Sequence, residues 1–152
     1  MSSCRWFLLA LGLVLADQLT KIAVRLGFAM GEKLPVTGFF NLTLAYNPGA
    51  AFSFLADAGG WQKFFFAALA LAVSGWIAVL LYRHPEKRLQ NFALALIMGG
   101  AIGNVIDRFA YGAVVDFLDF HIGQLHWPAF NCADSGIVVG AVLLVLAEIK
   151  KS

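Results

Sequence analysis

Four long apolar segments dominate the pattern of hydrophobic and polar positions along the chain. A helix that crosses a membrane needs about 17–25 mostly apolar residues. The last run, 135–149, reaches that length only when Ala133 and Asp134 are added to it. The pattern therefore predicts four membrane-spanning helices, at 6–26, 64–82, 92–109 and 133–149.

A different pattern occupies the segment between the first two apolar runs. "FNLTLAY" at 40–46 alternates in part between apolar and polar residues, which favours a β-strand. "NPG" at 47–49 has the composition of a turn, and "AAFSF" at 51–55 is expected to return as a second strand. The predicted fold class is an all-α polytopic membrane protein, a single domain over 1–152, with a small β-sheet on the outer surface.

The composition agrees with a membrane protein. Hydrophobic residues make up 61% of the chain, charged residues only 13%, and the mean hydropathy is +0.79. Soluble domains have about 45–50% apolar and about 25% charged residues. A net charge of +2 without a basic stripe excludes nucleic-acid binding. The two cysteines do not form a disulfide framework.

Basic residues indicate the orientation in the membrane. They gather before the first predicted helix, between the second and third, and after the fourth, at Arg5, 83–88 and 150–151. The segments 27–63 and 110–131 are poor in them. Since basic loops stay in the cytoplasm, we expect both termini and the 83–88 loop inside, and the other two loops outside the inner membrane.

The N-terminal residues allow a second interpretation. "MSSCRWFLLALGLVLA" also resembles a cleavable signal peptide, with a charged start, an apolar core and small residues near Ala16. The helical pattern continues beyond that point through "DQLTKIAVRL". We therefore expect the first helix to be retained.

Charged and amide side chains near the predicted helices lie almost entirely toward the outer side. An ionised side chain in the middle of a spanning helix costs about 2.5–3.5 kcal/mol, so it is retained where it faces a bundle interior or a wet cavity. Scattered helix-end charges would not give this asymmetry. The sequence predicts a polar site at the outer membrane surface, formed from Asp17, Lys21, Asn104, Asp107, Arg108, Asp116, Asp119 and Asp134.

The spacing of these residues supports a common site. Asn104, Asp107 and Arg108 fall at i, i+3 and i+4, on one face of a helix, and Asp17 and Lys21 are also one turn apart. Two small-xxx-small pairs lie next to the polar positions, at 99/103 and 136/140. Such pairs let helix backbones approach closely, so we expect the third and fourth helices to pack beside the site.

Several of these residues also have a purely structural interpretation. Asp17 and Lys21 are equally compatible with a buried ion pair that holds the first helix in place, and Arg108 with a side chain that extends to lipid headgroups. Asn131 and Asp134 have the spacing of a helix capping box.

The remaining polar positions carry weaker signals. Asn104 is also compatible with a hydrogen bond that only joins two helices, and Asp119 is expected to be a solvated loop charge. His121 and His126 lie five residues apart in one loop with no third ligand in sight. Because catalytic zinc usually takes three protein ligands, no metal site is expected.

The chemistry that remains available is that of carboxylates. No serine has a histidine in reach by sequence, and Cys132 lacks one as well. Two acids held close together cannot both ionise easily, so one keeps its proton. The ionised member can take a proton from water while the protonated member polarises a carbonyl. That is aspartic peptidase chemistry, which needs no cofactor, and the residues alone leave the pair open among Asp107, Asp116, Asp119 and Asp134.

Five motifs in order resemble the bacterial lipoprotein signal peptidase (signal peptidase II) family. They are "DQLTK" at 17–21, "YNPGAAF" at 46–52, "GNVIDR" at 103–108, "VVDF" at 114–117 and "FNCADS" at 130–135. The resemblance implies an aspartic endopeptidase of the inner membrane. Its family cuts prolipoproteins just before a diacylglyceryl-modified cysteine.

The resemblance also implies roles for individual residues. The family's catalytic pair falls on Asp116 and Asp134. Its supporting and substrate-binding positions fall on Asp17, Asn47, Asn104, Asp107, Arg108 and Asn131. We expect modified prolipoproteins, membrane lipids and globomycin-type inhibitors as partners of a monomer.

Two other function classes fit four short spans with buried charges. A small proton-coupled transporter is the main alternative, although acids at the outer surface rather than the midplane disfavour alternating access. A scaffold that assembles through its small-xxx-small faces is the other, and it leaves Asp116 and Asp134 without a role.

Overall fold

The computed structural model describes residues 3–49 and 60–150 of the chain. Within this part, four helices are long and apolar enough to cross a membrane. The four predicted spans are confirmed, and each helix begins slightly earlier than expected. The helices are α1 (Cys4–Gly27), α2 (Gln62–Arg83), α3 (Arg88–Tyr111) and α4 (Cys132–Ile149).

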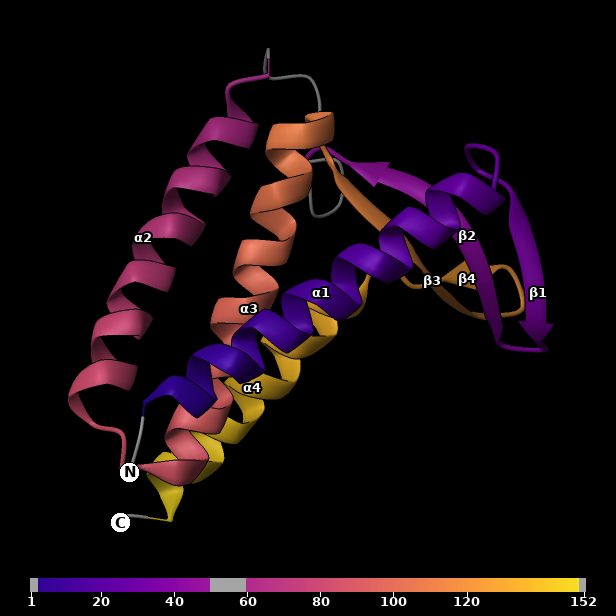
Figure 1. The fold of residues 1–152 in the computed structure, drawn as a ribbon. Coiled ribbons are helices and arrows are strands. Elements are labelled where there is room, and N and C mark those ends of the chain that lie inside the picture. The colour runs from indigo at the N-terminus through magenta and orange to yellow at the C-terminus, as the bar shows by residue number, and fades with distance from the viewer. Residues whose placement is uncertain (1–2, 50–59, 151–152) are drawn as a thin grey trace.

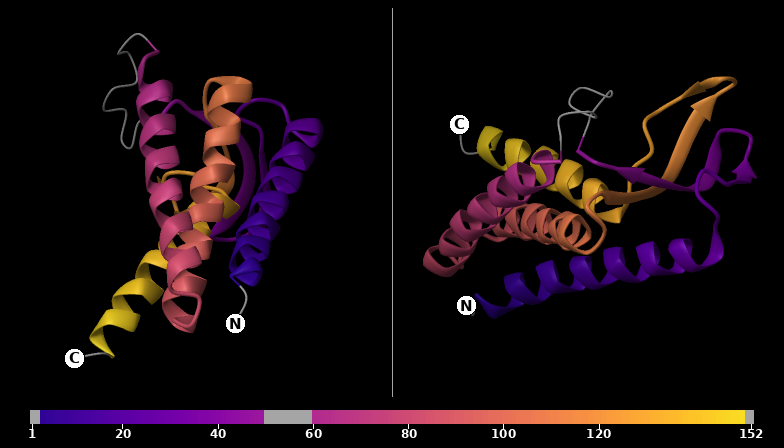
Figure 2. Two further views of the ribbon diagram at one scale, coloured as in Figure 1. Left: turned by 60° about the vertical axis from the view of Figure 1, so that its left-hand side comes forward. Right: turned by 90° about the horizontal axis from the view of Figure 1, so that it is seen from above.

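The central element is α3, which contacts each of the other three helices. In Figure 1, α2 and α3 run side by side while α1 and α4 cross them obliquely, and the two termini lie at the same end. Figure 2 shows the sheet extending sideways from the opposite end of the helices. Half of the residues of α3 are buried, a larger share than in any of the other three helices. Its inward face is therefore the natural place for polar groups.

Glycines allow the helices to approach this closely. A Cβ on Gly99 would lie 2.7 Å from the carbonyl oxygen of Ala10 in α1, and a Cβ on Gly140 would lie 2.6 Å from that of Ala93 in α3. A Cβ on Gly103 would lie 2.6 Å from the carboxylate of Asp17. Helices α3 and α4 contact each other. The 99/103 pair mainly accommodates α1, and Ala133 Cβ of α4 would lie 3.4 Å from a Cβ on Gly103.

A four-stranded antiparallel sheet completes the fold, in the order β1-β2-β3-β4. The predicted strand at 40–46 is confirmed within β2, whereas the predicted return strand at 51–55 lies outside the described residues. The partners of β2 are instead β1 and β3. The strands are β1 (Lys33–Thr37), β2 (Phe40–Asn47), β3 (Val114–Ile122) and β4 (Leu125–His126).

The expectation that Asp116 and Asp119 lie in a loop was wrong, because both belong to β3. Gly112 ends α3 with a φ of 76°, a left-handed conformation that glycine adopts without strain. The chain then turns into β3, where Ala45 of β2 pairs with Asp116. The turn and this pairing bring Asp116 of β3 back next to the end of α3.

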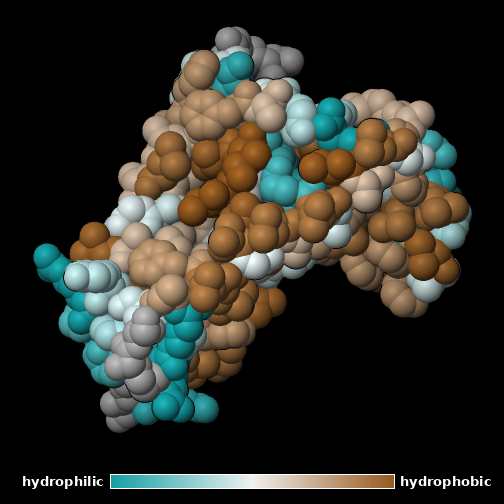
Figure 3. Space-filling model, in the orientation of Figure 1, coloured by the Kyte–Doolittle hydropathy of each residue, from teal (hydrophilic) through white to brown (hydrophobic). Residues whose placement is uncertain are grey.

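The surface is largely apolar over the helices. Figure 3 shows brown, hydrophobic atoms over the middle of the helical body and teal, hydrophilic atoms where the termini lie. Large apolar side chains such as Leu19, Trp76 and Phe109 are more than 60% exposed. Soluble monomers rarely expose apolar patches of this extent, so these faces are suited to lipid.

The glycine contacts give a stability prediction. Gly99→Ala should lower the free energy of unfolding by about 1–3 kcal/mol, because its methyl group would overlap the Ala10 carbonyl. Gly75→Ala is the matched control: this α2 glycine has no atom within 4 Å of its Cβ position. Thermal unfolding in one detergent would compare them. Equal melting temperatures would contradict the close approach of α1 and α3.

Candidate active site

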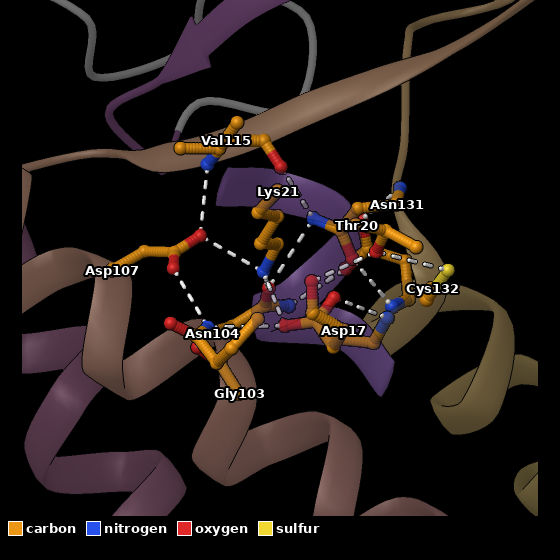
Figure 4. Close-up of polar contacts among 12 residues, drawn as sticks. Asp17, Thr20, Lys21, Gly103, Asn104, Asp107, Val115, Asn131 and Cys132 are labelled. Atoms are coloured by element: carbon orange, nitrogen blue, oxygen red, sulfur yellow. Dashed lines mark hydrogen bonds and ion pairs between the residues drawn. The ribbon is translucent and has the colours of Figure 1, made fainter. Parts of the chain in front are cut away.

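A buried ion cluster lies where α1 meets α3. The ammonium of Lys21 is 2.7 Å from Asp17 Oδ2, 2.8 Å from Asp107 Oδ2, and donates a 3.0 Å hydrogen bond to Asn104 Oδ1 (Figure 4). The three ionic side chains are at most 1% exposed. Since an ammonium has three donors, Lys21 is fully paired. We call Asp17, Lys21 and Asp107 the ion cluster.

The two carboxylates of the ion cluster also bind backbone N–H groups. Ala133 N donates to Asp17 Oδ1 at 2.9 Å, and Val115 N donates to Asp107 Oδ2 at 2.9 Å. Gln18 Nε2 adds a 3.0 Å bond to Asp107 Oδ1. The cluster therefore joins α1 and α3 to the start of α4 and to β3.

The carboxyl group of Asp116 is held by amides. Asn131 Nδ2 donates to its Oδ1 at 2.7 Å and Asn47 Nδ2 donates to its Oδ2 at 3.1 Å. Gly49 N donates to Asn47 Oδ1 at 3.0 Å, so the nitrogen of that amide must face Asp116. Asp116 is only 2% exposed.

Asp134 lies in the first turn of α4, in a capping box. Its N–H donates to Asn131 Oδ1 at 2.9 Å, and its Oδ2 accepts from Asn131 N at 3.2 Å. Asn104 Nδ2 donates to its Oδ1 at 2.8 Å. The capping interpretation is thus confirmed, and the same Asn131 also contacts Asp116. Asn131 and Asn104 link the two carboxyl groups.

Burial raises the pKa of Asp116 to about 7, and the nearby charge of Asp134 adds to the rise. Hydrogen bonds from Asn47 and Asn131, and the positive charge of Lys21, oppose it only in part. Asp116 therefore keeps its proton to a higher pH than an exposed aspartic acid does.

Arg108 lies beside this pair at the end of α3. Its Nη1 donates to Asn104 O at 3.2 Å, and its guanidinium carbon is 5.5 Å from the ring centre of Phe66. Its buried Nε has no hydrogen-bond partner among the described residues. The side chain borders a cavity of about 210 Å³, together with Lys63, Phe64 and Phe109.

Asp119 is not a solvated loop charge, as expected from the sequence, but a buried one. Its carboxylate accepts from Asn41 Nδ2 at 3.0 Å and lies 3.1 Å from Lys33 Nζ and 2.7 Å from His126 Nδ1. Burial alone would raise its pKa, but the hydrogen bonds from Asn41, His126 and Lys33 lower it to about 2. Asp119 therefore stays ionised in the sheet.

The four acids that the sequence left open are now distinguished by their partners. Asp107 and Asp119 each pair with a lysine. Asp116 and Asp134 instead each accept from an asparagine amide, Asn131 for Asp116 and Asn104 for Asp134. Gln18, which sequence reasoning missed, adjoins Asp17 and contacts Asp107; its position in the "DQLTK" motif was the only available signal.

Comparisons with known proteins agree on one family. A family model described as signal peptidase (SPase) II matches residues 9–150. Proteins named lipoprotein signal peptidase are 59% identical in Cupriavidus taiwanensis, 61% in Ralstonia nicotianae and 58% in Burkholderia mallei. The alignments cover 96% of this chain and 83%, 84% and 88% of those proteins, respectively.

A solved structure gives the same result for the fold. It is described as a bacterial membrane enzyme determined by the in meso method. The TM-score is 0.85 at 30% identity, over 96% of this chain and 88% of that one.

Proposed function

The chain belongs to the signal peptidase II family, and on that premise we propose that it is an aspartic endopeptidase whose catalytic pair is Asp116 and Asp134. The enzyme removes signal peptides from prolipoproteins, as its relatives' shared name states. These relatives give no support to the alternative of a proton-coupled transporter. The observation that carries the catalytic assignment is the pair of asparagine amides that hold these carboxyls and bond to each other. Asn131 Nδ2 donates to Asp116, Asn104 Nδ2 donates to Asp134, and Asn131 Nδ2 also donates to Asn104 Oδ1 at 3.3 Å.

The protonation of the pair suits peptide hydrolysis. Asp134, as the ionised member, takes a proton from water, and the water oxygen attacks the scissile carbonyl carbon. Asp116 gives its proton to the carbonyl oxygen. As the tetrahedral intermediate collapses, the C–N bond breaks, the leaving nitrogen takes the proton from Asp134, and Asp116 regains its own. Both carboxyls return to their starting states.

The supporting residues divide into two groups. Asn47, Asn104 and Asn131 hold the two carboxyls directly. Asp17 and Asp107 act indirectly. They accept hydrogen bonds from the backbone N–H groups of Ala133 and Val115, the residues that precede Asp134 and Asp116.

Arg108 is the residue we propose for substrate contact, because its unpartnered Nε and the adjacent cavity suit a substrate carbonyl or a lipid oxygen. The proposed substrate is a prolipoprotein that carries diacylglycerol on the cysteine after the cut. Globomycin-type inhibitors would bind at the same place on a monomer.

We further propose that the termini are cytoplasmic and the pair lies at the outer face, because the basic 83–88 loop is at the opposite end from the sheet. In a Cys132→Ser background, a membrane-impermeant maleimide added outside the inner membrane should label Glu32→Cys and leave Glu86→Cys unlabelled. The reverse pattern would contradict this orientation.

Loss of either catalytic carboxyl should abolish cleavage. Asp116→Asn and Asp134→Asn are each expected to lower kcat by at least about 10³-fold, because neither an amide nor a lone carboxyl can supply both acid and base. Cleavage of a diacylglyceryl-modified prolipoprotein by purified enzyme would measure this.

Asp119→Asn is the matched control for these variants, since it removes a buried carboxylate from the same strand. It should retain cleavage. Activity that survives in folded Asp116→Asn or Asp134→Asn, but is lost in Asp119→Asn, would contradict the assignment.

The raised pKa of Asp116 predicts a loss of activity in alkali. As the pH rises through about 7, Asp116 ionises and can no longer protonate the carbonyl oxygen. The value of kcat should therefore fall on the alkaline side with an apparent pKa near 7, measured under saturating substrate. A rate that stays constant up to pH 9 would contradict the role of Asp116 as the acid.

A further inference from the structure

The ion cluster is buried and does not touch the proposed reacting groups directly. Each of its members, however, binds a residue that adjoins Asp116 or Asp134 in sequence or by a hydrogen bond. We propose that Lys21 is a positioning residue for the reaction, which fixes the orientation of the Asn104 amide and the backbone on which both catalytic aspartates are carried. This inference rests on the proposed function of Asp116 and Asp134.

The first argument concerns the Asn104 side chain. A lysine ammonium can only donate, so the atom of Asn104 that faces Lys21 at 3.0 Å must be the carbonyl oxygen. The amide nitrogen is thereby turned toward Asp134 Oδ1, which accepts its hydrogen bond at 2.8 Å. A flipped amide would place two donors against the ammonium and withdraw the donor from Asp134.

The second argument concerns the backbone. Asp17 binds the N–H of Ala133, the residue immediately before Asp134. Asp107 binds the N–H of Val115, the residue immediately before Asp116. Lys21 pairs with both of these carboxylates, at 2.7 and 2.8 Å. Through them, one side chain connects the backbone next to Asp134 with the backbone next to Asp116, and these two backbone positions set the distance between the two aspartates.

The orientation of Asn104 has a chemical consequence. The hydrogen bond that Asn104 donates holds Asp134 Oδ1 in one position. Among the described residues, the charged groups around Asp134 are Arg108 of α3, Asp116 of β3 and, behind Asn104, the ion cluster of α1 and α3. Without Lys21, only the longer 3.3 Å bond from Asn131 Nδ2 keeps the Asn104 oxygen turned away from Asp134, so the donor to Asp134 is held less firmly.

The test compares Lys21→Met, Lys21→Arg and the charge-balanced double variant Lys21→Met/Asp107→Asn with wild type. Thr20→Val is the matched control, because within the described part of the chain its hydroxyl bonds only to Ala16 O, Asp17 O and Cys132 Sγ. For each, kcat and KM for a diacylglyceryl-modified prolipoprotein are measured across pH, together with thermal unfolding in detergent.

The expected result is a kcat lowered about tenfold or more, with KM within about threefold of wild type. The same loss of kcat in the charge-balanced variant would trace it to the lost hydrogen bonds rather than to net charge. Lys21→Arg should recover part of kcat, and Thr20→Val should match wild type.

A folded Lys21→Met enzyme with wild-type kcat would overturn the proposal, and so would a lower melting temperature as its sole change. Asn104→Ala keeps the test decisive even if the Lys21 variants do not fold, because it leaves the three ions paired. Wild-type kcat in Asn104→Ala would refute the orienting role. Cleavage by folded Asp116→Asn, in contrast, would refute the proposed function itself.

Discussion

One buried ammonium determines how the helix ends next to the sheet are arranged. A charge in a low-dielectric interior is tolerated only when it is paired and fully hydrogen-bonded, and removing one partner of such a pair costs about 3–5 kcal/mol. Lys21 meets this condition with two carboxylates and one amide oxygen. Because its partners lie on α1 and α3 and themselves bind the backbone of α4 and β3, any other arrangement of these four elements would leave a charge unpaired.

Amides around the proposed catalytic pair suit the protonation that the proposed reaction needs. Two buried acids on the same strand, Asp116 and Asp119, show the contrast. Asp119 is held by Lys33 and His126 as well as an amide, and its pKa falls to about 2. Asp116 is held by Asn47 and Asn131, and its pKa rises to about 7. Neutral donors can fix a carboxyl in position without forcing it to ionise, so asparagine suits an acid that must carry a proton.

The sequence was sufficient for the elements whose signals are local. The four helices follow from apolar run length, and the capping box of Asn131 and Asp134 from their spacing. The strand β3 was missed because its partner, β2, lies some seventy residues away in the sequence, beyond α2 and α3. The burial of Asp119 was missed for the same reason: Asn41, Lys33 and His126 reach it only once the sheet has formed.

The proposed catalytic pair could not be identified from local sequence signals either. The residues alone could not choose among four acids, because the choice depends on which of them are paired with lysine, a property of the folded chain. The family resemblance selected Asp116 and Asp134, and the folded structure supplies a physical basis for that selection.

The position of the two aspartates on different kinds of element adds an asymmetry that identical side chains could not provide. Asp134 lies in the first turn of α4, where its carboxyl accepts from the backbone N–H of Asn131 and from the side chain of Asn104. Asp116 lies within β3, where Asn47 and Asn131 hold its carboxyl and burial raises its pKa to about 7. We therefore propose Asp116 as the acid, which leaves the role of base to Asp134. On this proposal, the division of labour between two chemically equal residues follows from their different surroundings.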